Sequence, residues 1–327
     1  MRRLLVGGLM LFVGVLACPP GLRADEAAAV AWVSAHGGKI ARDDKQPDRP
    51  IVKVDLYRIG GSQVTDAGLK ELSALRKLQS LNVGFSKVTD AGLKELASLH
   101  DLEDLNLCFT QVTDAGIKEL APLPSLRTLD LNSTKVTDAG LAELASHKSL
   151  RNLTLCSTSV TDAGLQHLTA VKDLESINLF GTGVTDAGLK HLAPLKSLRV
   201  LELDRTRVTD AGMKELASSR SLEWLSLWNV RITDAGLKEL SAIKSLRELN
   251  LRETQVTDAG LKHLPSLEGL RELILQDTGV TDAGLQELAA CKGLRVLYLY
   301  GTKVTPAGIA KLQEALPECH ISQVLIE

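Results

Sequence analysis

The sequence predicts an α/β solenoid, a curved horseshoe of stacked coils with a parallel β-sheet on its concave face and short helices on its convex face. The main observation is a repeat: the segment Val-Thr-Asp-Ala-Gly, first found at residues 64–68, returns with a constant 24-residue period and without an insertion. A fixed period of this length is typical of solenoid proteins. Later copies begin at Val88, Val112, Val136, Val160, Val184, Val208, Ile232, Val256, Val280 and Val304.

Each copy also contains the pattern of a strand and that of a helix. Apolar and polar residues alternate at the end of the stretch from Leu102 to Leu107, as in a short strand with one buried face. Thr113 and Asp114 are residue types that cap helices, and Ile117 and Leu120 follow at a helical spacing of three. One such coil cannot bury its apolar side alone, but stacked copies form a continuous core.

Composition limits the core and the partners. Hydrophobic residues make up 44% of the 327 residues but aromatic residues only 3%, so the core should be aliphatic. The chain has 38 basic and 40 acidic residues, and residues 1–24 hold three of the basic ones, so the remainder carries 35 against 40, a net charge of −5. Nucleic-acid binding needs clustered basic residues, and this balance argues against it.

Residues 1–24 have the composition of a secretory signal peptide. Arg2 and Arg3 precede the apolar stretch from Leu4 to Ala17, which is too short to span a bilayer comfortably. Cleavage after Ala24 would release a secreted or periplasmic protein. The alternative is a lipobox that ends at Cys18, which would leave a lipid-anchored N-terminus. No later segment is apolar enough to span a membrane.

We expect a signal peptide over residues 1–24, an N-terminal cap over 25–63, repeats over 64–316 and a C-terminal capping strand over 317–327. Capping units protect the ends of a solenoid core from water. In the caps we predict a helix over 26–36 that carries Trp32, a turn at Gly37 and Gly38, a surface loop over 43–50, a first strand over 54–59 placed one repeat period before 78–83, a last helix over 309–316 and a closing strand over 319–326.

The repeat resembles that of leucine-rich-repeat proteins over residues 51 to about 316. Its Thr-Asp-x-Gly-Leu segment is similar to the cysteine-containing subclass found in F-box proteins, although no F-box precedes it. The 24-residue units of secreted bacterial proteins are the closer match. Where the subclass has Cys, this chain has a ladder of threonines, whose hydroxyls we expect to satisfy backbone groups of the neighbouring coil: Thr110, Thr134, Thr158, Thr182, Thr206, Thr254, Thr278 and Thr302.

In this fold the variable strand positions face the concave side and are free to specialise. The first column contains Ser80, Asp104, Thr128, Asn152, Ser176, Val200, Trp224, Glu248, Glu272 and Val296. The second column contains Asn82, Asn106, Asp130, Thr154, Asn178, Glu202, Ser226, Asn250, Ile274 and Tyr298. The third column contains Gly84, Cys108, Asn132, Cys156, Phe180, Asp204, Trp228, Arg252, Gln276 and Tyr300.

Aromatic residues gather on these columns or directly after them, and none takes a core leucine position: Phe85, Phe109, Phe180, Trp224, Trp228, Tyr298 and Tyr300. Exposed aromatic and arginine side chains dominate binding interfaces. The candidate partner-binding residues are therefore Phe180, Glu202, Asp204, Trp224, Trp228, Arg252, Tyr298 and Tyr300, with Arg205 and Glu253 in the same stretch. The alternative is drift, because the repeat tolerates bulky residues at few other places.

Other candidate sites have structural explanations. An aspartate that recurs at each helix start, from Asp66 to Asp282, should cap that helix rather than bind calcium. His167, His191 and His263 replace a surface glutamate and have no ligand-spaced partners, so we expect no metal site.

The cysteines are too few for a disulfide scaffold. Cys108 and Cys156 lie two coils apart, too far for a disulfide, whereas a bond between Cys291 and Cys319 stays open at this point.

No catalytic motif is present, so we predict neither an enzyme nor a cofactor. The sequence favours a monomeric, non-catalytic protein-binding scaffold that acts through its concave face. Two alternatives stay open: a structural protein associated with the cell envelope, and a glycan-binding module that uses the aromatic side chains as stacking platforms.

Overall fold

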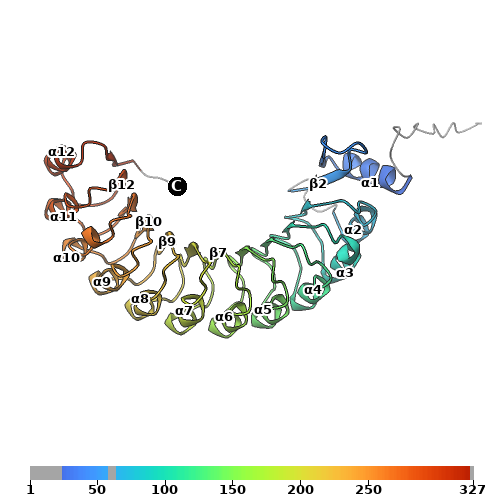
Figure 1. Cartoon of the computed structure of the whole chain (residues 1–327), viewed down its shortest axis with the longest axis horizontal. Coiled ribbons are helices and arrows are strands. Elements are labelled where there is room, and N and C mark those ends of the chain that lie inside the picture. Colours follow the sequence, from blue (N-terminus) through green and yellow to red (C-terminus); the bar gives the residue numbers. More distant parts are fainter. Residues whose placement is uncertain (1–23, 58–63, 325–327) are drawn as a thin grey trace, which may run out of the picture.

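The computed structural model describes residues 24–57 and 64–324, which form a single arc (Figure 1). One sheet of 13 strands lines the inside of the arc, and its strands follow one another in chain order from β1 to β13. The strands from β2 to β13 are parallel, and the short helices cover the outside of the arc. This is the predicted solenoid. Among the described residues no helix is both long and apolar enough to cross a membrane.

The strands are β1 (Lys39–Arg42), β2 (Ile51–Asp55), β3 (Ser80–Asn82), β4 (Asp104–Asn106), β5 (Thr128–Asp130), β6 (Asn152–Thr154), β7 (Ser176–Asn178), β8 (Val200–Glu202), β9 (Trp224–Ser226), β10 (Glu248–Asn250), β11 (Glu272–Ile274), β12 (Val296–Tyr298) and β13 (His320–Ser322). The helices are α1 (Ala24–Ala35), α2 (Asp66–Leu72), α3 (Asp90–Leu93), α4 (Asp114–Glu119), α5 (Asp138–Leu144), α6 (Asp162–Leu168), α7 (Asp186–Leu192), α8 (Asp210–Leu216), α9 (Asp234–Leu240), α10 (Asp258–Leu261), α11 (Asp282–Leu288) and α12 (Pro306–Ala315), with 3₁₀ turns at Lys94–Ser98 and Leu264–Ser266.

The core is aliphatic, as the composition predicts. Leucine and valine side chains from every coil fill the space between the sheet and the helices, and the fully buried hydrophobic set of the described chain contains no aromatic residue. Trp32 of α1 packs on the edge of this core at its N-terminal end, where it covers the first coil. Burial of this continuous core is the main source of stability, because each buried leucine contributes about 2 kcal/mol.

In the helices from α3 to α12 the side chain that caps the helix start is the repeated threonine and not the aspartate. Thr113, for example, accepts a hydrogen bond from the N–H of Ala115 at 3.3 Å. The aspartate is the first helical residue, and its carboxylate bonds the next coil: Asp114 accepts from the N–H of Thr137 at 2.7 Å and from its hydroxyl at 2.7 Å. We call this inter-coil series the Asp–Thr ladder. The capping role predicted for the aspartates is therefore wrong, since the following coil supplies the donors.

The glycine of the repeat makes room for the Asp–Thr ladder. A Cβ atom on Gly164 would lie 2.5 Å from the Oδ1 of Asp138 in the preceding coil and 2.9 Å from Leu141. The last copy has Pro306 in place of the aspartate, and in this chain no further Val-Thr-Asp-Ala-Gly segment follows it. The threonine, the aspartate and the glycine of the repeated segment thus all have a packing or hydrogen-bonding role at the junction between two coils.

The threonine ladder on the other side of each coil is local. The Thr110 hydroxyl is buried and donates to the carbonyl of Leu107 at 2.6 Å, within its own coil. Thr182 and Thr278 do the same with Leu179 and Leu275. The predicted bond to the neighbouring coil is not formed, because the threonine closes the turn that follows its own strand.

A left-handed residue follows the third column in each coil, which the sequence analysis missed. These residues, here the turn column, have φ between 53° and 71°: Phe85, Phe109, Ser133, Ser157, Gly181, Arg205, Asn229, Glu253, Asp277 and Gly301. The N–H of Arg205, for instance, donates to the carbonyl of Trp228 in the next coil at 2.9 Å. This conformation lets the backbone hydrogen bonds between coils continue beyond the short strands. Only two residues of the turn column are glycine, so its composition does not reveal the left-handed conformation.

Ser157→Gly should therefore stabilise the protein slightly. Its φ of 53° is unfavourable for a residue with a Cβ atom, and relief of that strain outweighs the added freedom of the unfolded chain by about 0.5 kcal/mol. The measurement is the thermal midpoint. Ser176→Gly, at an ordinary strand position of β7, is the control and should lower the midpoint. Equal losses in both variants would contradict the strain argument.

Both caps differ in detail from their predicted forms. An antiparallel strand, β1, precedes β2, and Val54 pairs with Leu81, so the first strand is displaced by three residues from the predicted register. The reason is burial: Val54 and Leu56 fill the core, which leaves Tyr57 40% exposed.

At the other end α12 begins at Pro306, three residues before the prediction, and β13 ends at Ser322. Beyond β13, the carbonyl of Val324 accepts from the amide of Gln276 at 3.1 Å, so this part of the chain reaches back to β11. The predicted leader and lipobox lie outside the described residues.

Candidate functional site

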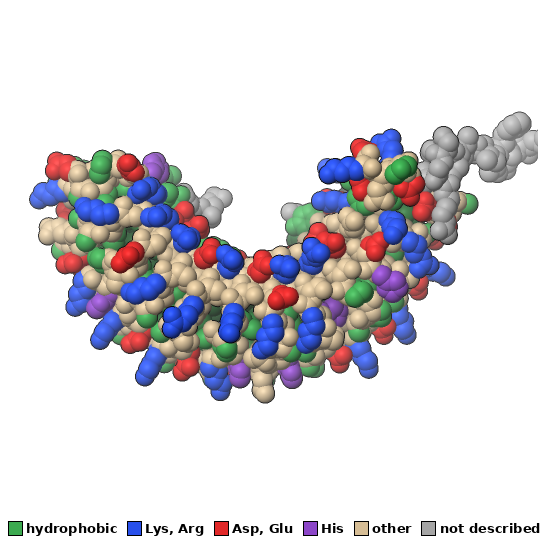
Figure 2. All heavy atoms as spheres, in the orientation of Figure 1, with side chains coloured by type: hydrophobic (Ala, Val, Ile, Leu, Met, Phe, Trp, Pro, Cys, Tyr) green, Lys and Arg blue, Asp and Glu red, His purple; other side chains and the backbone are tan. Residues whose placement is uncertain are grey.

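The first two columns have the same register along the whole sheet. Trp224 pairs with Val200 on one side and with Glu248 on the other, while the leucine between the two columns points into the core. The inside of the arc is hollow, and charged side chains cover its flank and its convex side (Figure 2). From β3 to β12 the three columns hold six acidic residues but a single basic one, Arg252.

Many second-column residues are structural and not free to specialise. The side chains of Asn106 and Asn178 accept from the backbone N–H two residues later, at 2.9 Å and 3.0 Å. Asn82, Asp130 and Asn250 do the same. This turn is a common role of Asn and Asp, and it holds the third column in place. The sequence signal was present, because Asn and Asp recur in this column.

Four side chains form a cluster of aromatic rings and guanidinium groups, which we call the Trp228 cluster. It comprises Phe180, Trp228 and Arg252 of the third column and Arg205 of the turn column. The Arg205 guanidinium carbon lies 4.5 Å from the Trp228 ring centroid and 5.5 Å from that of Phe180. The Arg252 guanidinium lies 5.2 Å from the Trp228 centroid. Phe180 and Trp228 are 6.0 Å apart at a tilt of 45°. Cation–π contacts of this kind contribute about 0.5–1 kcal/mol each where they are exposed.

Two acidic side chains of the turn column pair with Arg252 of the cluster. The carboxylate of Glu253 lies 3.4 Å from Arg252, and the Asn229 amide donates to it at 2.7 Å. The Trp228 indole and the Asn229 amide keep the pKa of Glu253 below its ordinary value. The carboxylate of Asp277 lies 3.7 Å from Arg252. The rings and guanidinium groups are therefore held in place by contacts within the fold.

Asp204, a predicted binding residue, is committed to the fold. It is only 7% exposed, and its carboxylate accepts from the Ser226 hydroxyl at 2.6 Å and from the Trp228 N–H at 2.7 Å. Ser226 occupies the second-column position where five other coils have Asn or Asp, and Asp204 from the preceding coil supplies the missing acceptor. Asp204 thus positions Trp228, and burial raises the pKa of its carboxyl group.

Glu202 lies beside Asp204 and accepts from the Asn178 amide at 2.5 Å. Burial and the Asp204 charge raise the pKa of Glu202 to about 7, against the opposing effect of the Asn178 hydrogen bond. A raised carboxyl pKa means that the folded state binds the proton more tightly than the unfolded chain does. Its contribution is most favourable below pH 4.5 and is lost as the pH rises to about 7.

Glu202→Gln should therefore stabilise the protein at high pH only. The uncharged amide keeps an oxygen for Asn178 and removes the repulsion with Asp204. After allowance for partial solvent screening we expect a gain of about 1 kcal/mol above pH 7 and almost none near pH 4.5. Thermal midpoints of both proteins across this range measure the effect. A gain independent of pH would show that Glu202 does not titrate in the folded state.

The other predicted residues are more dispersed. Trp224 is half-buried in the first column, on the same strand as Ser226 but outside the ring contacts of the described residues. Tyr298 and Tyr300 lie two to three coils further along the stack, and Tyr300 is 41% exposed. Neither tyrosine makes a ring contact with the Trp228 cluster in the described part of the chain. The structure thus brings Phe180, Trp228 and Arg252 together and leaves the tyrosines apart.

A second aromatic group lies at the N-terminal end. The rings of Phe85 and Phe109 stack at 4.2 Å, and Tyr57 meets Phe85 edge-on at 5.3 Å. Phe109 remains 44% exposed. Phe85 contacts the rings of both Tyr57 and Phe109 and is half-buried, whereas Phe109 stays open to solvent. This group provides an aromatic surface that is separate from the Trp228 cluster.

The cysteines and the acidic residues show no reactive or metal centre in the described chain. Cys108, Cys156, Cys291 and Cys319 are free thiols. Burial raises the pKa of Cys108 and Cys291 to about 11 and that of Cys156 to about 12, so these thiols are protonated at neutral pH. No group of three or more His, Cys, Asp and Glu side chains that could hold a metal ion occurs among the described residues.

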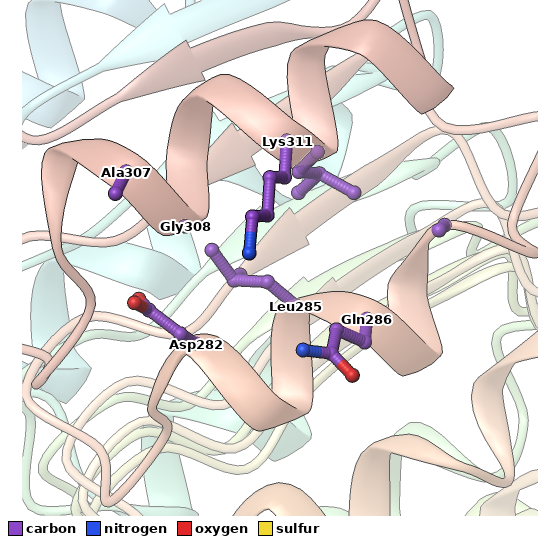
Figure 3. A pocket seen from close by; sticks show the side chains of 8 residues that line it. Asp282, Leu285, Gln286, Ala307, Gly308 and Lys311 are labelled. Carbon is purple, nitrogen blue, oxygen red and sulfur yellow. The ribbon is translucent and has the colours of Figure 1, made fainter.

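One pocket lies on the convex side, between α11 and α12 (Figure 3). It has a volume of about 190 Å³ and is lined by Leu285, Ala289 and Leu312, with Asp282 and Lys311 beside it. Pockets for small-molecule ligands usually exceed about 300 Å³. The α11–α12 pocket is therefore a gap between the last two helices and not a candidate site for a substrate.

Comparison with known proteins agrees with this fold. A family model described as a leucine-rich repeat region matches residues 59–309. No curated protein matches the chain. An internalin (inlF) from Listeria monocytogenes has a similar structure, with a TM-score of 0.55, 20% identity, and coverage of 93% of this chain and 96% of that one.

Two further structures are similar over less of the chain. Internalin C2 from Listeria monocytogenes has a TM-score of 0.49 at 23% identity and covers 83% of this chain and 92% of its own. The plant peptide hormone receptor RGFR1, solved in complex with RGF2, has a TM-score of 0.47 at 14% identity and covers 80% of this chain and 49% of its own. Because the family model matches most of the length of the chain, the chain belongs to the leucine-rich-repeat region family.

Proposed function

We propose that this protein is a non-catalytic scaffold that binds another protein through the concave side of its sheet, with the Trp228 cluster as the anchor. The observation that carries the proposal is the arrangement of Phe180, Trp228 and two arginines on adjacent coils at the edge of the hollow. Trp and Arg are the residue types most enriched among side chains that dominate binding energy. The candidate binding residues are Phe180, Trp224, Trp228, Arg252, Tyr298 and Tyr300, with Glu202 beside them.

The same geometry favours a protein over a glycan. Stacking on a sugar ring needs an open aromatic face, but the Arg205 guanidinium already lies over the Trp228 ring. The guanidinium groups also provide donors for carboxylates and backbone carbonyls of a polypeptide. A structural role at the cell envelope would need no pre-positioned cluster of this kind. Asp204 contributes by fixing the Trp228 backbone and not by contact with the partner.

The test is capture of partners from culture medium and envelope extracts of the native source with immobilised protein that begins at Asp25. We expect Trp228→Ala to abolish or strongly reduce capture of the specific partner. Phe109→Ala removes an aromatic ring that is 44% exposed at the other end of the arc, outside the Trp228 cluster, and serves as the control. Circular dichroism establishes that both variants keep the fold. Equal capture by the wild type and Trp228→Ala would refute the anchor and favour the structural alternative.

We propose that the protein works outside the cytoplasm, because a basic, apolar leader precedes residue 25. We also propose that it acts as a monomer. Cleavage after Ala24 gives a secreted or periplasmic protein, and lipidation of Cys18 is the alternative. Mass spectrometry of the mature N-terminus distinguishes the two, since only the second leaves a diacylated cysteine.

A further inference from the structure

Two glutamates face the hollow side by side. Glu248 on β10 and Glu272 on β11 are direct partners in the parallel register of the first column. Adjacent parallel strands are about 4.8 Å apart, so the two carboxylates are close neighbours. No salt bridge or hydrogen bond of either side chain occurs among the described residues. Like charges in this position destabilise a sheet.

The flank of the same coils shows the opposite arrangement. One position before the strands, neighbouring coils pair opposite charges: Arg199 bonds Glu223 at 2.6 Å, and Arg151 bonds Glu175. Charged side chains at that position are therefore paired with an opposite charge on the neighbouring coil, whereas, among the described residues, Glu248 and Glu272 in the first column are not. Burial and the Glu248 charge raise the pKa of Glu272, which agrees with an uncompensated pair.

The surroundings favour a basic partner segment. Trp224 precedes Glu248 in the first column and provides an aromatic wall at one end of the pair. Val200 lies beside Trp224 at one end of the Trp224–Glu248–Glu272 row, and Val296 lies beside Glu272 at the other end. Apolar side chains therefore border the row at both ends. From β3 to β12 the first column holds Asp104, Glu248 and Glu272 and no basic residue, so the electrostatic potential along this column attracts positive charge over a wider area.

We propose that the partner of this scaffold is a basic polypeptide segment that places a lysine or arginine side chain between Glu248 and Glu272, against Trp224. The cation would relieve the repulsion between the two carboxylates, and the Trp224 ring would receive the aliphatic part or the charge of the same side chain. The Trp228 cluster would contact the flanking part of the segment. This inference rests on the proposed function and names the chemistry of its partner.

The binding test uses two defined peptides, acetyl-Lys-Ala-Lys-Ala-Lys-Ala-Lys-amide and its glutamate counterpart, titrated at low ionic strength and followed by calorimetry. We expect the lysine peptide to bind the mature protein and the glutamate peptide not to bind. The double variant Glu248→Gln, Glu272→Gln should bind the lysine peptide at least about fivefold more weakly, since each close charge pair contributes appreciably to affinity. Added salt should weaken the wild-type interaction.

Glu175→Gln is the matched control, because it removes one carboxylate from the flank of the same sheet. It should leave binding of the lysine peptide within about twofold of the wild type. Equal affinities of the wild type and the double variant, equal affinities for both peptides, or no binding of the lysine peptide would each overturn the proposal. Capture that still depends on Trp228 would then leave the protein-binding function standing with a partner of different chemistry.

Thermal stability gives a second readout that needs no ligand. Glu272→Gln should raise the thermal midpoint, because it removes the repulsion with Glu248. Glu175→Gln should lower the midpoint or leave it unchanged, since its carboxylate is paired with Arg151. A lower midpoint for Glu272→Gln would show that the pair is compensated within the fold and would remove the basis of the inference.

Discussion

Gly164→Ala is expected to destabilise the solenoid by about 3 kcal/mol, although helix propensity alone predicts a gain of about 1 kcal/mol for this change. Gly164 lies in the first turn of α6, and a Cβ atom there would lie 2.5 Å from the Oδ1 of Asp138. The Asp138 carboxylate would have to move. It would then lose its hydrogen bonds with the N–H and the hydroxyl of Thr161, at 2.7 Å and 2.6 Å. Chemical or thermal unfolding measures the loss.

Two further variants test the cause. Gly183→Ala is the matched control, because its Cβ would meet its nearest neighbours, in the preceding coil, only at 3.3 Å. It should change stability by less than about 1 kcal/mol. In an Asp138→Ala background the cost of Gly164→Ala should fall, and the difference is the coupling energy of the pair. A stabilising Gly164→Ala would contradict the role of the Asp–Thr ladder.

Asp204→Ala is expected to destabilise the protein by about 2 kcal/mol, the cost of leaving buried donors unsatisfied, and to disturb the Trp228 cluster. The change leaves the Ser226 hydroxyl and the N–H of Trp228 without the acceptor that they share. Ser226 is 1% exposed, so water does not readily replace the lost partner. Thermal unfolding reports the stability. In a Trp32→Phe, Trp224→Phe background, which leaves Trp228 as the one tryptophan, the emission spectrum reports the environment of Trp228.

Asp204→Asn separates the acceptor from the charge. The amide oxygen can accept both hydrogen bonds, and the raised pKa of Asp204 indicates that burial disfavours its charge. We therefore expect the Asn variant to be at least as stable as the wild type at pH 8 and to keep the wild-type emission spectrum. If Ala and Asn caused equal losses, the carboxylate charge and not the hydrogen bonds would position Trp228.

The constant repeat period was sufficient to predict the architecture because each coil repeats the same burial problem. Local conformation was harder to predict. The turn column adopts a left-handed backbone with Phe85 or Arg205 as well as with Gly181, since inter-coil hydrogen bonds impose the conformation even where a Cβ atom makes it unfavourable. The partner of each ladder aspartate lies in the next coil, a contact that the composition of one helix start does not reveal.

The candidate site could be predicted from the sequence only in part, for a similar reason. Column positions placed Phe180, Trp228 and Arg252 on one surface, which the structure brings together. Asp204 acts as the acceptor because position 226, one coil later, is not Asn. Predicting this role requires knowing the side-chain directions in both coils. The like-charged pair in the first column was visible in the sequence, but its lack of compensation became clear only when the flanking arginines were seen to bond elsewhere.

The Asp–Thr ladder also bears on how this protein can change over evolutionary time. Each aspartate bonds the coil after it, and each glycine accommodates the coil before it, so the interior junctions are interchangeable with respect to this ladder. Recombination between copies that adds or removes one whole repeat unit therefore creates a new junction with the same partners as the old ones. The separation between the Phe85–Phe109 stack and the Trp228 cluster can thus grow or shrink in whole coils, which would let one scaffold be fitted to partners of different length.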